Sequence, residues 1–332
     1  MRHQLTRRHL LSGSAALAAA SVVTTKLAAQ APVQASWPSR SVRVIVPYPP
    51  AGGADTVSRI LFAKLSDHLG QQYVIDNRGG AGGTLGAAVA AKAEPDGYTV
   101  LYDATGFSVN PSLYPKLAFD YVKDFQPVFL ASLVPNILVV HPSVEVKTVA
   151  DLIALAKRTP DGLDFASSGN GTLQHLCLEM FRHATGAKVN HIPYRGGALA
   201  LNDLIGGQVK FFFSNGAASV ALVLNRQVRA IAHTGKGRLA TLPDVPAIAE
   251  TLSGFEAYEW NGVFVPTGTP SAVSRRLNAG LNAVLRNQEV AERLTSLNVE
   301  YRQNTPDDFR AFVAAEMEKW NRLIRDANIK LG

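Results

Sequence analysis

Two segments of the chain combine residue types that could bind an anion. Residues 46–55 (VPYPPAGGAD) and residues 166–172 (ASSGNGT) each place a glycine-rich turn between an apolar, strand-like run and a helical pattern. Glycine lets backbone N–H groups approach a ligand closely, and the start of a helix leaves such groups unpaired. Together with the helix dipole, these donors can bind a carboxylate or another anion without a cationic side chain.

A single loop of this kind is better explained as a plain tight turn. Two of them, one in each predicted half of the chain, favour a binding site, because open α/β sheets bind ligands at the carboxyl ends of their strands. The candidate ligand-binding residues of the first loop are Tyr48, Pro49, Ala51, Gly52, Gly53 and Asp55. Those of the second loop are Ser167, Ser168, Gly169, Asn170, Gly171 and Thr172. His175 is added to them, because it either faces the same cleft or hydrogen-bonds locally at the start of the next helix.

Sequence patterns of enzymes and cofactor sites are absent. Residues 78–84 (RGGAGGT) lack the spacing of a dinucleotide or P-loop motif, so we interpret them as a structural turn beside the cleft. There is no G-x-S-x-G elbow, no H-E-x-x-H motif and no Cys/His cluster. We therefore expect no catalytic residue, no metal and no cofactor. Glu179 and Asp203 are expected on solvated helix faces, and Cys177 is expected to be a small buried hydrophobe.

Short β-rich runs alternate with amphipathic helical patterns, which predicts α/β layers with mostly parallel sheets and right-handed crossovers. The predicted strands are residues 42–46, 73–75, 98–102, 163–166, 189–192, 209–213 and 228–232. The predicted helices are residues 56–69, 84–93, 151–157, 173–185, 198–205, 217–224, 270–286, 288–296 and 306–327.

The length of 332 residues suits about two domains. The last three predicted helices should pack back on the first domain. This gives a discontinuous lobe 1, residues 36–136 plus 260–332, and a continuous lobe 2, residues 137–259. Crossovers between the lobes are expected near residues 134–139 and 255–263.

Residues 1–35 have the three parts of a secretory signal peptide: a basic start, an apolar stretch and small residues before a cleavage site. Arg7 and Arg8 suit the twin-arginine (Tat) route, although general (Sec) signals also carry paired arginines. The segment holds four basic residues and no acid, so its removal lowers the net charge from +7 to +3. This small charge gives no reason to expect a nucleic-acid partner. The single cysteine excludes an internal disulfide.

The order of short motifs resembles the periplasmic substrate-binding receptors of tripartite tricarboxylate transporters, the Bug or TctC type. The motifs are VIVPYP (44–49), NRGGAGG (77–83), PDGYT (95–99), NPSLY (110–114), DFQPV (124–128), ASSGNGT (166–172), IPYRG (192–196), GGQV (206–209), LPDVP (242–246), PTGTP (266–270) and KW (319–320). The resemblance implies a two-lobed periplasmic-binding-protein (Venus flytrap) fold. In that fold, backbone groups of the two loops would grip the ligand carboxylate between the lobes, and Tyr194 joins the candidates on this ground.

One departure from the family pattern concerns the first loop. Only Ala54 separates Gly53 from Asp55, and Ala51 stands where the family often has glycine. The side chains that select the rest of the ligand are expected in the cleft. The candidates are Tyr48, Phe107, Asn215 and Trp260, although the three aromatic rings could equally belong to the core.

The resulting hypothesis is a monomeric, non-enzymatic periplasmic protein that captures a small organic acid and delivers it to membrane transporter subunits. Lobe closure around a hinge would bury the ligand. Two alternatives remain open: presentation of the ligand to a membrane sensor, and an exported hydrolase or isomerase.

Overall fold

The computed structural model describes residues 37–330, and everything below concerns the compact unit that starts at Pro38. The expected signal peptide, residues 1–35, lies outside the described residues. Within them, no helix is both long and apolar enough to cross a membrane.

The strands form one mixed sheet in the order β2-β1-β3-β9-β4-β7-β5-β6, with β8 paired to β4. Two groups in it are parallel, as the alternation of strands and helices predicts: β1 pairs with β2 and β3, and β5 pairs with β6 and β7. The strands of these groups, together with β8, are β1 (Val42–Val46), β2 (Tyr73–Asn77), β3 (Thr99–Ala104), β5 (Leu163–Ser167), β6 (Val189–Pro193), β7 (Phe211–Asn215) and β8 (Arg229–His233).

Two strands connect the parallel groups, and all their pairings are antiparallel. β4 (Phe125–Val140) pairs with β9 (Tyr258–Pro266) as far as Pro135, and from Asn136 onward it pairs with β7. The sheet is therefore more mixed than expected. The alternation of strands and helices in the sequence predicts the parallel pairings within each lobe. It does not predict a long strand such as β4, which pairs with strands of both lobes. The expected crossover segments coincide with the places where β4 changes partners and where β9 begins.

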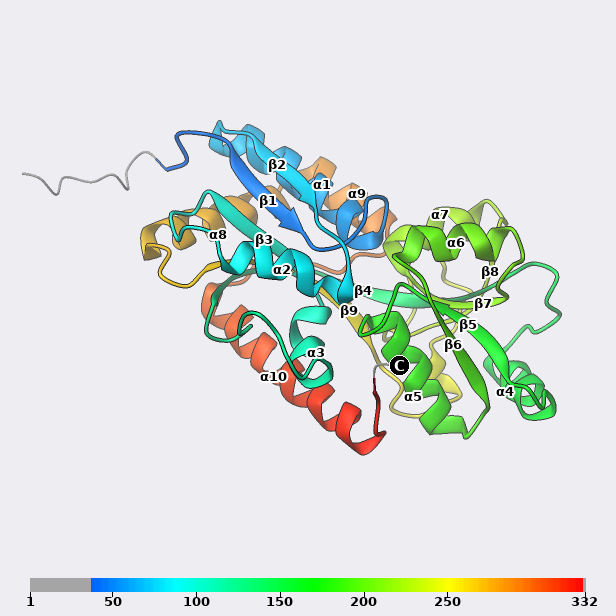
Figure 1. Cartoon of the computed structure of the whole chain (residues 1–332). Coiled ribbons are helices and arrows are strands. Elements are labelled where there is room, and N and C mark those ends of the chain that lie inside the picture. Colours follow the sequence, from blue (N-terminus) through cyan, green and yellow to red (C-terminus); the bar gives the residue numbers. More distant parts are fainter. Residues whose placement is uncertain (1–36, 331–332) are drawn as a thin grey trace, which may run out of the picture. The chain divides into compact units, whose positions relative to one another are not determined.

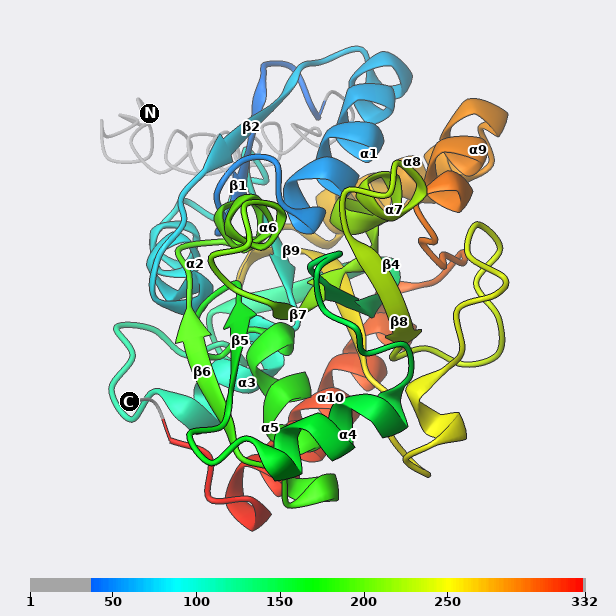
Figure 2. The same cartoon turned by 90° about the vertical axis from the view of Figure 1, so that its right-hand side faces the viewer.

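Helices cover both faces of each half of the sheet, which gives the two-lobed α/β fold (Figure 1). In the half that contains β5 to β8, α6 and α7 lie on one face while α4 and α5 lie on the other (Figure 2). The α-helices are α1 (Gly53–Leu69), α2 (Thr84–Ala91), α3 (Gly106–Leu113), α4 (Val149–Arg158), α5 (Leu173–Thr185), α6 (Gly197–Ile205), α7 (Gly216–Leu224), α8 (Ser271–Leu285), α9 (Gln288–Ser296) and α10 (Pro306–Asp326). Two short 3-10 helices, η2 (Ala81–Gly83) and η3 (Ile248–Glu250), complete the described elements.

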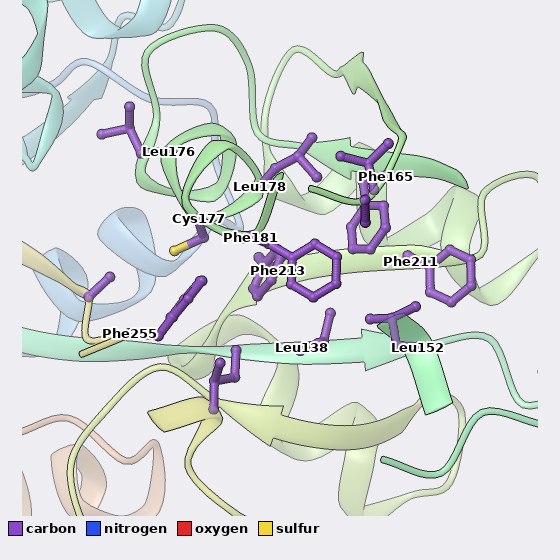
Figure 3. Packing of buried hydrophobic residues seen from close by; sticks show 14 of the residues in the cluster. Leu138, Leu152, Phe165, Leu176, Cys177, Leu178, Phe181, Phe211, Phe213 and Phe255 are labelled. Atoms are coloured by element: carbon purple, nitrogen blue, oxygen red, sulfur yellow. The ribbon is translucent and has the colours of Figure 1, made fainter. Parts of the chain in front are cut away.

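The core of the second lobe contains aromatic residues from β5, β7 and α5, and Cys177 belongs to the same cluster (Figure 3). Cys177 is fully buried, and burial raises the pKa of its thiol to about 12, so it is the small hydrophobe that the sequence predicts. Trp320 and Ile324 of α10 join the same cluster. The last helix therefore packs on the second lobe as well as the first, which a division of the chain by sequence alone does not express.

Phe107 and Trp260 do not face the cleft. Both are fully buried in a second cluster, where the ring of Phe107 stacks on Phe264 with centroids 3.9 Å apart. Their rings therefore hold the first lobe together, and the alternative interpretation of them as core residues is correct.

Candidate ligand site between the lobes

A cleft lies where the carboxyl ends of β1, β3, β5, β6 and β7 meet. It borders about 570 Å³ of space that protein atoms do not fill, part of it open to solvent. Each of these strands is followed by a helix whose first turn reaches the cleft, and both lobes contribute. The residues at the helix starts are Gly52, Gly53, Ala54, Thr105, Gly106, Thr172, Leu173, Gln174, Gly196, Gly197, Asn215 and Ala218. The remaining lining residues are Tyr48, Pro49, Ala104, Ser168, Ser214 and Glu259.

The backbone at several of these helix starts is free of side-chain caps. In the described structure, Gly52 before α1, Thr172 before α5 and Gly196 before α6 provide no side-chain cap for the helix that follows. The hydroxyl of Thr172 instead donates back to the Gly169 carbonyl at 2.7 Å. Only α7 is capped at this cleft by a side chain, because Asn215 Oδ1 accepts from the Ala217 N–H at 2.9 Å. Uncapped first-turn N–H groups and aligned dipoles from both lobes make the cleft attractive to an anion.

Asp55 shapes the first loop from behind and does not line the cleft. Its carboxylate accepts from the Ala51 N–H at 3.0 Å and from Asn77 Nδ2 at 2.9 Å, and it forms a 2.9 Å ion pair with Arg59. Burial alone would raise the pKa of Asp55, but the bonds from Arg59, Ala51 and Asn77 outweigh it and keep the pKa low. Asp55 therefore acts as an ionised anchor that fixes the loop.

Ala51, the residue that departs from the family pattern, has a left-handed backbone with φ of 62°. Glycine adopts this conformation at no steric cost, whereas alanine pays for its Cβ. The loop thus keeps the glycine-type turn, with Asp55 holding its N–H in place. Ala51 does not line the cleft.

The second loop is held by hydrogen bonds on the side away from the cleft. Ser167 Oγ and His191 Nε2 are 2.5 Å apart, and the Gly169 N–H donates to Ser167 Oγ at 3.1 Å. The Gly171 N–H donates to His175 Nδ1 at 3.3 Å. Gly169 has φ of 127° and Gly171 has φ of 77°, so both positions require glycine.

His175 is a local support of this loop, which is the second of the two roles considered for it. Its ring is buried and stacks on His191 at 4.0 Å between centroids, with the planes 7° apart. Glu179 lies 3.6 Å from His175 Nε2 and forms a 3.0 Å ion pair with Arg182. The expectation of a solvated Glu179 is wrong, because this residue is only 8 % exposed and its carboxylate lies beside the ring of His175.

The structure brings part of the predicted site together at the cleft. Among the predicted residues, those that line it are Tyr48, Pro49, Gly52, Gly53, Ser168, Thr172 and Asn215. Those that lie beside it are Ala51, Asp55, Ser167, Gly169, Asn170, Gly171, His175 and Tyr194. The Tyr194 hydroxyl donates to Asp203 Oδ2 at 2.8 Å. Asp203, which was expected on a solvated helix face, therefore has a protein hydrogen-bond partner.

Several lining residues were missed by sequence reasoning. Thr105–Gly106 after β3 and Gly196–Gly197 after β6 repeat the strand–glycine–helix pattern that identified the first two loops. The same signal could have found them. Gln174 and Glu259 carried no such signal, because a polar residue in a helix or strand reads as solvent-facing.

Glycines bring the two lobes into direct contact around the cleft. A Cβ built on Gly53 would lie 2.2 Å from Asn215 Oδ1, and one on Gly196 would lie 2.3 Å from Pro49 Cγ. The described structure therefore has its lobes together, with side chains of one lobe seated on bare backbone of the other.

The charged side-chain chemistry of the cleft is acidic. No Lys, Arg or His is found among the described residues that line it, and Glu259 is its one carboxylate. Burial raises the pKa of Glu259, and the hydrogen bond from Gln174 and the nearby amide of Asn215 lower it only in part. Behind the wall, Tyr48 donates its hydroxyl to Asp103 at 2.9 Å, and burial raises the pKa of Asp103 to about 7. Across residues 37–330 no group of three or more His, Cys, Asp or Glu side chains could hold a metal ion.

A family model described as "Tripartite tricarboxylate transporter family receptor" matches residues 57–329. The chain belongs to this receptor family. It is 35 % identical to the protein BugT of Bordetella pertussis over 305 residues, which cover 91 % of this chain and 94 % of BugT. These matches confirm the family that the sequence motifs suggest.

Solved structures of similar proteins agree with the fold. R. palustris Rpa4515 with adipate superimposes with a TM-score of 0.86 and 35 % identity, covering 89 % of this chain and 99 % of that one. MatC from Rhodopseudomonas palustris with bound malate gives a TM-score of 0.82 and 31 % identity, covering 87 % and 100 %. The two-lobed binding-protein fold is thereby confirmed.

Proposed function

We propose that the protein captures a small carboxylate-bearing ligand in the cleft between its lobes and delivers it to the membrane subunits of a tripartite tricarboxylate-type transporter. The observation that carries the proposal is the convergence of uncapped helix N-termini from both lobes on one cleft without a basic side chain. Such a site binds an anion through backbone donors. The adipate and malate of the two similar structures are carboxylates of the expected size.

The remaining parts of the proposal concern location and assembly. Residues 1–35 direct export to the periplasm, where the mature chain acts as a monomer. Residues 36–136 with 260–332 form one lobe and residues 137–259 the other, and the lobes rotate about β4 and β9, where the strands pass between them. A rotation there opens the cleft without breaking either parallel group.

Isothermal titration of the mature protein tests capture. The panel contains C4–C6 di- and tricarboxylates, aromatic acids and amino acids, with uncharged sugars as the control. Saturable binding of acids and none of sugars is the expected result. A ligand set made up of uncharged sugars would refute the anion site.

Delivery needs a separate measurement in cells. Deletion of the gene should abolish uptake of the acid identified by titration, and a plasmid copy should restore it. Normal uptake in the deletion strain would refute the transport role.

A further inference from the structure

Glu259 is an unusual residue for a cleft that receives an anion. It lies on β9 next to Trp260, and because side chains alternate along a strand, Trp260 enters the core while Glu259 enters the cleft. Glu259 is only 9 % exposed, and within the described part of the chain no Lys, Arg or His forms an ion pair with it. Buried carboxylates normally have a positive partner.

The groups around Glu259 are neutral donors. Gln174 Nε2 donates to Glu259 Oε2 at 2.5 Å, and the same amide nitrogen lies 3.5 Å from Asn136 Oδ1. The Asn215 amide lies close enough to favour the ionised carboxylate. Its Nδ2 is buried, lines the cleft and makes no hydrogen bond of normal geometry to any described residue. Amide donors prepare a carboxylate to stay charged, but they do not supply the missing positive charge.

We propose that Glu259, Gln174 and Asn215 form a subsite for a protonated amine carried by the ligand, so that the cleft takes an amino acid rather than a plain di- or tricarboxylate. This proposal rests on the proposed function, which assigns the ligand carboxylate to the helix N-termini. An ammonium group has three N–H donors and one positive charge. It would donate a charge-assisted hydrogen bond to a carboxylate oxygen of Glu259. We name these three residues the amine subsite.

The charge distribution around the cleft supports this assignment. Asp103 is a second buried acid, connected to the cleft wall through Tyr48, and its Oδ2 has no hydrogen-bond partner among the described residues. Tyr48, Tyr102 and Cys177 interact electrostatically with Glu259, and none of these three is cationic. A second ligand carboxylate placed here would meet a like charge in a desolvated site, which is unfavourable unless one of the two takes up a proton.

Matched ligand sets test the proposal on the wild-type protein. Each set keeps one carbon skeleton and compares the plain acid, the hydroxy acid, the amino acid and the diacid. Some sets carry the varied group at the ω-carbon of C3 to C8 acids, and others carry it at the α-carbon. Titration at pH 7.5 in buffers of different ionisation enthalpy reports affinity and proton uptake together. In at least one set the amino acid should bind about 10- to 100-fold more tightly than the diacid, with little proton uptake.

Two variants locate the effect. Glu259→Gln keeps the shape and removes the charge, so amino-acid affinity should fall about 10- to 100-fold while diacid affinity stays or rises. Glu256→Gln is the matched control, because Glu256 lies outside the cleft in an ion pair with Lys236. Its affinities should equal those of the wild type.

Each other outcome has a defined meaning. Tighter binding of a diacid, with or without uptake of a proton by Glu259, overturns the amine subsite and leaves the proposed function intact. The same holds if plain acids bind and no amino acid does. If no acid of any set binds, both the amine subsite and the proposed function are refuted.

Discussion

Replacing Gly53 by alanine should impair lobe closure without harming the fold. Gly53 is the first residue of α1, and its backbone is one that alanine adopts readily. A Cβ there would lie 2.2 Å from Asn215 Oδ1, 2.3 Å from its Cγ and 2.7 Å from its Nδ2. Because Gly53 and Asn215 belong to different lobes, the clash exists only when the lobes are together.

The size of the effect follows from what Asn215 does. The side chain must retreat by about 1 Å to reach normal contact. Such a shift weakens the bond from Ala217 N–H to Asn215 Oδ1 that caps α7, and loss of a cap costs about 0.5–2 kcal/mol. Keeping Asn215 in place instead overpacks the interface by about 1–3 kcal/mol. Closure should therefore lose about 1–2 kcal/mol, which corresponds to a 5- to 30-fold weaker affinity.

Titration with the best ligand of the panel measures the loss, and a thermal melt of the unliganded protein checks the fold. The melting temperature of Gly53→Ala should stay the same or rise, because alanine is favoured over glycine in a helix. Gly206→Ala is the matched control and should bind normally. Gly206 does not line the cleft, its backbone is right-handed, and its Cβ would make only ordinary contacts, with Asn202 O at 3.4 Å and Asp203 O at 3.9 Å.

A double-mutant cycle isolates the clash, because Asn215 also belongs to the amine subsite and its replacement has an effect of its own. Asn215→Ser shortens the side chain but keeps a cap oxygen, so Gly53→Ala should weaken binding less in the Asn215→Ser background than in the wild type. Equal affinity of Gly53→Ala and Gly206→Ala would show that closure does not bring Gly53 against Asn215, and the reasoning would fail.

Three further predictions concern the two loops. Ala51→Gly should raise the free energy of unfolding by about 0.5–1 kcal/mol in a urea titration, because it relieves a left-handed alanine; a decrease would contradict this. Gly169→Val should abolish most ligand binding while the thermal transition stays cooperative, since φ of 127° excludes a β-branched residue; unchanged affinity would remove the second loop from the site. Burial first, and the neighbouring His175 next, lower the pKa of His191 to about 3, so the folded state favours its neutral form. Stability from His191 is present above about pH 6.5 and is lost as the pH falls toward 3, so urea titrations at pH 7.5 and 4.5 should show a larger loss in the wild type than in His191→Gln.

The elements that the sequence predicts well are those in which local pattern and tertiary environment agree. α5 and α9 have the predicted bounds, and β1 does too. In the two helices the apolar spacing reports which face is buried, and in β1 a nearly continuous apolar run marks a strand that is buried on both faces. The two glycine loops were predicted as a pair, because one such turn is explained by local structure whereas two at the carboxyl ends of strands favour a site.

β4 and α3 were not predicted, and both contain proline where local rules exclude it. β4 carries Pro127 and Pro135, which argue against a central strand, yet register shifts in its pairing with β9 accommodate the first. α3 contains Pro111 in its second turn. Tertiary packing overrides local preference in both elements, and in β4 it does so where the chain passes between the lobes.

The site illustrates a sharper limit, at two adjacent residues of β9. Sequence reasoning selected Trp260 as a cleft residue, which is the correct strand but the wrong face. Successive side chains of a strand point to opposite faces, so an error of one residue exchanges a core position for a cleft position. The residue that does enter the cleft is Glu259. Uncapped helix N-termini attract a carboxylate to the cleft, whereas a buried acid among its lining residues disfavours a second one. Family membership predicts only the first of these two features. In the amine-subsite proposal, the choice of ligand depends on the side chain of Glu259. Its orientation follows from the register of β9 against Val134 of β4, and that register is a property of the folded sheet.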